Sequence, residues 1–100
     1  AGDDPEAARS ILRSFAEQTA GNCAELERAL GEGDAATVKT LAHKMLPIFT
    51  MLGAAGVAAT LRTAESWEGP LTDALRGEIG AAAENIRAIV AEAQKKVSLP

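Results

Sequence analysis

The chain has 100 residues, enough for a single domain over residues 1–100 with its own hydrophobic core. Its net charge of -4 argues against a nucleic-acid partner, and its single cysteine excludes an intramolecular disulfide. Aromatic residues make up only 3% of the chain and alanine is abundant, so the composition favours packed helices over a sheet. No apolar run reaches the roughly 20 residues of a membrane span, so we expect a domain without direct membrane contact, and the single cysteine fits a cytoplasmic location.

The first predicted helix covers about residues 5–31. Asp4 and Pro5 are a favourable start, because aspartate caps free backbone amides and proline is tolerated at the first helical position. Residues that suit a buried face then recur at spacings of three and four. They are Ala8, Ile11, Leu12, Phe15, Thr19, Cys23, Leu26 and Leu30. We expect Gly31 to cap the C-terminus of this helix, and Cys23 to be a small core residue.

Three further helices follow, over about residues 34–52, 54–67 and 71–97. Asp34 is a favourable N-cap of the second helix, Gly53 ends it, and Gly69 with Pro70 precedes the fourth. Pro47 lies inside the second helix, where it lacks an N–H for the carbonyl four residues earlier. We therefore expect that helix to be kinked but continuous. Four amphipathic helices with short loops predict an all-α, antiparallel up-down four-helix bundle.

The only histidine of the chain, His43, falls on the outward face of the second predicted helix. A helix advances about 100° per residue, which places His43 about 160° from Met45, within the apolar stripe. That stripe comprises Val38, Leu41, Ala42, Met45, Ile48, Phe49 and Leu52. The residues that share the outward face are Ala36, Lys39, Thr40, Pro47 and Thr50. We expect an exposed imidazole that a docked protein can reach.

Other catalytic constellations are missing from the sequence. One histidine and one cysteine on different helices do not make a metal site, and there is no glycine-rich phosphate loop. We therefore expect neither a cofactor, nor a metal, nor a self-contained enzyme. An exposed imidazole, in contrast, is a good nucleophile toward phosphoryl groups near neutral pH. Lys39 precedes His43 by one turn and Lys44 follows it directly, so either side chain can accompany an added phosphate. An ordinary surface histidine is the alternative interpretation.

The sequence around His43 resembles the signature of histidine-containing phosphotransfer domains. The matching residues are Ala42, His43, Gly53, Ala54, Val57, Ala64 and Glu65. The residues that resemble the lead-in of the family are Leu26, Ala29, Leu30, Gly33, Asp34 and Leu41. The motif covers residues 26–65, and the predicted arrangement of four helices extends the resemblance to the whole chain. Where the family usually has lysine and glycine, this chain has Leu46 and Pro47.

This resemblance implies an intermediate of a bacterial two-component phosphorelay, as a module of a larger, cytoplasmic or membrane-anchored sensor kinase. His43 would accept a phosphoryl group at Nε2 from the phosphoaspartate of a response-regulator receiver domain, and pass it to another receiver. The receiver would supply Mg²⁺, and the domain itself would be a monomer without ATP-dependent kinase activity. The docking face would comprise Ala36, Thr40, Leu46, Pro47 and Thr50, with Lys39 and Lys44 beside the phosphate.

Three alternatives remain open at this point. The substitutions at Leu46 and Pro47 are compatible with a binding-only helical module, which docks a receiver without phosphotransfer. A dimerising kinase domain is the second alternative, although such dimers contribute two helices per chain. A structural bundle with an incidental histidine is the third. Partly exposed Leu46 and Met51 would supply apolar contact in either docking interpretation.

Overall fold

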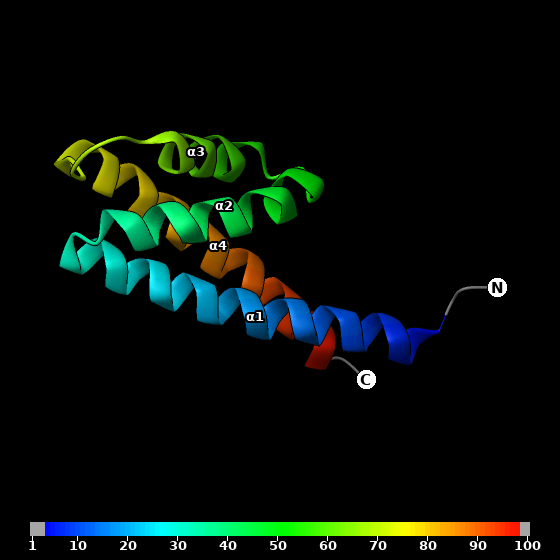
Figure 1. The fold of residues 1–100 in the computed structure, drawn as a ribbon. Coiled ribbons are helices and arrows are strands. Elements are labelled where there is room, and N and C mark those ends of the chain that lie inside the picture. Colours follow the sequence, from blue (N-terminus) through cyan, green and yellow to red (C-terminus); the bar gives the residue numbers. More distant parts are fainter. Residues whose placement is uncertain (1–3, 99–100) are drawn as a thin grey trace.

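Four helices make up the fold of the computed structural model, which describes residues 4–98. They are α1 (Pro5–Glu32), α2 (Ala35–Met51), α3 (Ala55–Ser66) and α4 (Asp73–Ser98). Helix α1 packs against α2 and α4, and α3 packs against the same two helices, which closes the bundle (Figure 1). No strand occurs within residues 4–98. The predicted all-α four-helix bundle is therefore confirmed.

The two ends of α1 are fixed by capping contacts. At its start the Asp4 carboxylate accepts a hydrogen bond from the Glu6 N–H at 3.0 Å, and Pro5 is the first helical residue, as predicted. The prediction that Gly31 caps the C-terminus is wrong. Helix α1 continues to Glu32, and Gly33 follows in the left-handed region with φ of 70°. Glycine has no Cβ to make that conformation costly, and here it turns the chain toward α2.

The core lies between all four helices and is built mainly from aliphatic side chains. The largest fully buried side chains are Phe49, Leu26, Met45, Leu61, Ile79, Ile86 and Val38. Cys23 is also buried, as predicted, and so is Thr19. Many of the other buried residues are alanines, which suits the composition of the chain.

Three predicted core residues are exposed instead. Ile11 is 71% exposed because it lies at the edge of the apolar face of α1, near the end that extends past the other helices (Figure 1), while the adjacent Leu12 packs against the core. Ala8 is also exposed, in the N-terminal turns of α1 that extend past the other helices (Figure 1). Leu52 is 53% exposed because it follows the last residue of α2 and forms its C-cap. Periodicity identified the right face of each helix but not where its neighbours end.

Helix α2 is continuous through Pro47 and begins at a strong cap. The Asp34 carboxylate accepts hydrogen bonds from the backbone N–H and the hydroxyl of Thr37, at 3.1 and 2.6 Å. These two bonds hold the pKa of Asp34 below its usual range. After Met51 the chain turns at Gly53, whose φ is 73°. The predicted N-cap, the continuous helix and the stop at Gly53 are all confirmed.

The remaining two helices begin and end within two residues of the predicted positions. Helix α3 ends at Ser66, and the Trp67 indole then donates a hydrogen bond to the Pro70 carbonyl at 3.0 Å. Helix α4 begins later than predicted, at Asp73, where the Thr72 hydroxyl accepts from the Leu75 N–H at 3.1 Å. Within residues 4–98, no helix combines the length and hydropathy needed to cross a membrane.

Candidate functional site

The candidate site is centred on His43, in the middle of α2. The flanking residues Ala42 and Met45 are buried in the core, which fixes the orientation of the helix and turns position 43 outward. The His43 side chain is 77% exposed. The predicted placement of the histidine on the outward face is therefore confirmed.

Glu65 of α3 holds one nitrogen of this imidazole. Its Oε1 lies 2.5 Å from His43 Nδ1, and its side chain is 31% exposed. A carboxylate only accepts hydrogen bonds, so the proton in this contact is assigned to Nδ1. Nε2 has no hydrogen-bond partner within residues 4–98. In the neutral ring Nε2 then carries the free lone pair, on an imidazole that a neighbouring helix holds in place.

The predicted neighbours of His43 are distributed around it as the helical periodicity requires. The exposed ones are Ala36, Lys39, Thr40, Lys44, Pro47 and Thr50. Leu46 differs, because it is partly buried and packs against the core. The Thr40 hydroxyl donates to the Ala36 carbonyl at 3.0 Å, one turn earlier in the helix. Just beyond this group, Met51 is 82% exposed.

Charge is distributed unevenly around this site. Helix α2 contains Lys39 and Lys44 and no carboxylate, and neither lysine forms an ion pair within residues 4–98. The only carboxylate of α3 is Glu65, which contacts the histidine. The chain as a whole has a net charge of -4. Helix α2 is thus a basic segment of an acidic protein.

The contact from Glu65 to His43 is not predicted from the sequence. Glu65 belonged to the matched motif, but it had no role in the site. It lies on another helix, so the periodicity around His43 carries no signal for it. The available signal was the antiparallel pairing of α2 with α3, which brings the middle of one helix beside the end of the other.

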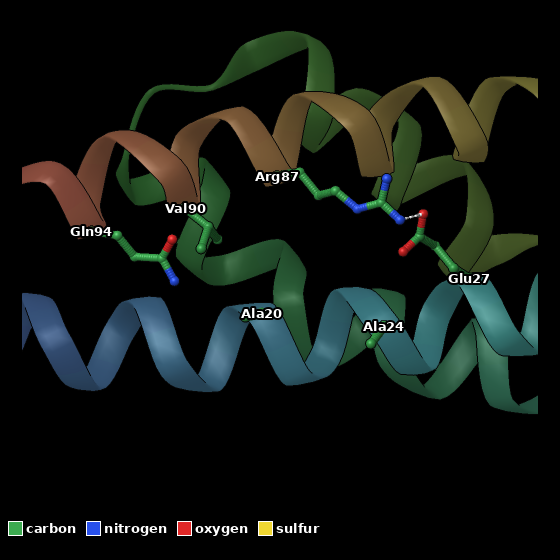
Figure 2. A pocket seen from close by; sticks show the side chains of 6 residues that line it. All are labelled: Ala20, Ala24, Glu27, Arg87, Val90 and Gln94. Carbon is green, nitrogen blue, oxygen red and sulfur yellow. Dashed lines mark hydrogen bonds and ion pairs between the residues drawn. The ribbon is translucent and has the colours of Figure 1, made fainter.

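Two other features of the bundle offer less chemistry than His43. Cys23 is buried, with Sγ 3.5 Å from the Ala83 carbonyl oxygen, and burial raises the pKa of its thiol. A hollow of about 350 Å³ lies between α1 and α4, and an ion pair between Arg87 and Glu27 bridges the two helices there (Figure 2). Neither feature brings a nucleophile to the surface. No group of three potential metal ligands occurs within the described residues.

Comparisons with protein-family models, with curated proteins and with solved structures gave no match.

Proposed function

We propose that this domain is a phosphorelay intermediate, which takes a phosphoryl group onto His43 from the phosphoaspartate of a receiver domain and passes it to the aspartate of another receiver. The observation that supports this proposal best is the held imidazole. Its Nδ1 contacts Glu65 at 2.5 Å, and the side chain is otherwise exposed. Such a ring presents Nε2 to a docked partner.

The proposed transfer balances as a simple displacement. The Nε2 lone pair attacks phosphorus and forms an N–P bond, while the bond from phosphorus to the aspartyl oxygen breaks and the aspartate leaves as a carboxylate. His43 becomes a phosphoimidazolium whose Nδ1 proton faces the Glu65 carboxylate. In the second transfer a receiver carboxylate attacks phosphorus and neutral imidazole leaves. The receiver supplies the bound Mg²⁺ in both transfers.

Glu65 acts in this scheme as a positioning residue. Its contact restricts rotation of the ring and keeps the proton on Nδ1, which leaves Nε2 as the nucleophile. Its negative charge also stabilises the imidazolium that forms as the N–P bond develops.

The outward face of α2 supports docking of a receiver. Short side chains at Ala36, Thr40 and Thr50 leave room beside His43, and Pro47 is compact. The lysines of α2 attract an acidic partner surface and speed its encounter with this face. Exposed Met51 adds apolar contact at the end of the same helix.

The proposal is tested by phosphotransfer from a receiver carrying labelled phosphate to the wild-type domain and to His43→Gln. We expect label on the wild type only. The label should be stable to alkali and labile to acid, as phosphohistidine is, and ATP alone should give none. Circular dichroism confirms that the variant is folded, which is expected because position 43 is exposed.

Two outcomes contradict the proposal. Label that appears equally on His43→Gln places the acceptor elsewhere. Binding to receivers without transfer to the wild type makes the domain a binding-only module, in which Leu46 and Pro47 preserve docking but not the chemistry.

A further inference from the structure

One edge of α3 faces the exposed part of α2. Ala55, Ala58, Arg62 and Glu65 lie within about 80° of one another around α3, so they share this edge. Glu65 contacts His43 of α2. The other three residues line a surface hollow between the two helices, which has a volume of about 220 Å³. The hollow and the candidate site therefore lie along the same pair of helices.

The hollow opens on the same face of α2 as His43 but at a distance from it. Thr50 lines the hollow, is exposed, and follows His43 by about two turns, or about 10 Å along the helix. Side chains on a helix lean toward its N-terminus, and α3 runs antiparallel to α2. The Arg62 side chain therefore leans toward Thr50 and away from the imidazole, and it does not take part in the chemistry at Nε2.

Arg62 is available to an anion from outside the domain. It is exposed and forms none of the ion pairs found within residues 4–98, whereas Arg9, Arg28 and Arg87 are all paired. The only carboxylate of α3 is Glu65, which is engaged with His43.

A receiver docked on His43 is large enough to reach this hollow. A stable interface buries roughly 800 Å² on each partner, which corresponds to a disc of about 16 Å radius. A partner centred on Nε2 therefore covers Thr50 and the edge of the hollow. The partner is also acidic, because it contains the acceptor aspartate and binds Mg²⁺ through carboxylate oxygens. Lys39, Lys44 and Arg62 form no ion pair within the described residues and give this face the complementary charge.

We propose that Arg62 is a docking residue, which pairs at this hollow with a carboxylate on the surface of the receiver. Arg62 then determines the affinity and the choice of receiver, and not the rate of the transfer step. This inference rests on the proposed function, because the partner is the same receiver. A guanidinium matches a carboxylate with two parallel N–H donors. The small lining residues Gly53, Ala55 and Ala58 leave room for the carboxylate side chain.

The test compares the wild type with Arg62→Ala, Arg62→Lys, Arg62→Glu and Arg13→Ala, each shown to be folded by circular dichroism. Arg13 is an exposed arginine on the side of α1 that faces α4, and it forms no ion pair within residues 4–98. Its removal controls for the loss of one positive charge away from the docking face.

Three quantities are measured for each protein. Titration with a fluorescently labelled receiver gives the Kd. Phosphotransfer from the phosphorylated receiver at saturating concentration gives the rate of the transfer step. Phosphoramidate, a small donor that needs no docking, gives the reactivity of His43 alone.

We expect Arg62→Ala to raise the Kd about three- to tenfold and Arg62→Glu to raise it further, because like charges repel. Arg62→Lys should restore most of the affinity, and Arg13→Ala should match the wild type. The saturated rate and the rate with phosphoramidate should be the same in all five proteins. The difference in Kd between the wild type and Arg62→Ala should shrink as the salt concentration rises, because salt screens exposed charges.

Two results overturn this inference. One is a Kd that is the same for the wild type, Arg62→Ala and Arg62→Glu. The other is a slower reaction of Arg62→Ala with phosphoramidate, which would show that Arg62 acts on His43 itself.

The failure of the proposed function is distinguishable from the failure of this inference. If a receiver binds the wild type but does not phosphorylate His43, the phosphorelay proposal fails, and the Kd values of the variants still decide whether Arg62 docks the receiver. If the wild type binds no receiver, both proposals are overturned.

Discussion

One carboxylate oxygen links α3 to the imidazole of α2. The contact from Glu65 to His43 Nδ1 crosses between two helices that otherwise meet through apolar side chains. Its donor and acceptor are both partly solvated, at 77% and 31% exposure, so its contribution is reduced by screening. The contact therefore contributes little to stability, and its main effect is to determine which nitrogen of the imidazole is free.

Glu65→Gln and Glu65→Ala separate the charge of this carboxylate from its position. Glutamine keeps an acceptor for Nδ1 but removes the charge that stabilises the imidazolium, so we expect transfer to His43 to slow about threefold. Alanine removes both, and we expect a loss of about tenfold, or about 1.4 kcal/mol of barrier. Single-turnover transfer from a phosphorylated receiver at saturating concentration measures the step without the contribution of docking.

Glu68→Gln is the matched control, since Glu68 is an exposed carboxylate just after α3. The positioning role is wrong if Glu65→Ala transfers as fast as Glu68→Gln, or if both variants of Glu65 affect only the binding of the receiver.

At the scale of the elements, helix ends depend on single backbone conformations. Two glycines lie at the junction of α1 and α2: Gly31 is in the last turn of α1, and Gly33 follows the helix and is the one with a positive φ. The N–H groups of Gly33 and Asp34 donate to the carbonyls of Leu30 and Ala29, at 3.2 and 2.9 Å, which satisfies the last turn of α1.

Alanine substitutions at these two glycines should have opposite effects on stability. Gly33→Ala forces a Cβ into the left-handed region and should lower the free energy of unfolding by about 1–2 kcal/mol. The new Cβ also meets the Arg76 guanidinium, a flexible end that can move away. Gly31→Ala lies within α1 with no atom near its added Cβ, and should raise the free energy by about 0.5–1 kcal/mol. Urea unfolding of both variants measures the difference, and equal effects would contradict the assignment of the cap.

The elements were largely predictable from the sequence, and the site only in part. Periodic apolar residues and the caps at Asp4 and Asp34 determine helices locally, so four helices were predicted within about two residues of their ends. The choice between Gly31 and Gly33 depends on backbone dihedrals, which the residue types do not determine. His43 was predictable because its exposure follows from the periodicity of its own helix. The contact from Glu65 was not, because it depends on the register between two helices.

At the scale of the whole molecule, charge and burial are distributed in different ways. Lys39 and Lys44 of α2 form no ion pair within residues 4–98 and lie near the candidate site, while carboxylates are frequent on α1. This asymmetry favours an acidic partner at α2, because complementary potentials speed association. The interface between α1 and α4, in contrast, buries a titratable group: Cys23, the only thiol of the chain, lies beside the Ala83 carbonyl.

That thiol makes the stability of the bundle depend on pH in alkaline solution. Burial, and secondarily the charge of Glu27, raise the pKa of Cys23 above its usual value, so the folded state holds the thiol proton more tightly than the unfolded state does. The resulting stabilisation is fully present below the ordinary thiol pKa and is lost as the pH rises through the raised one. We expect the melting temperature of the wild type to fall more steeply than that of Cys23→Ala between about pH 8 and pH 10. The alanine variant should be less stable at neutral pH because it leaves a small cavity. The test therefore compares how the melting temperature changes with pH, not its absolute value. Parallel curves for the two proteins across this range would show that the thiol does not titrate differently in the folded bundle.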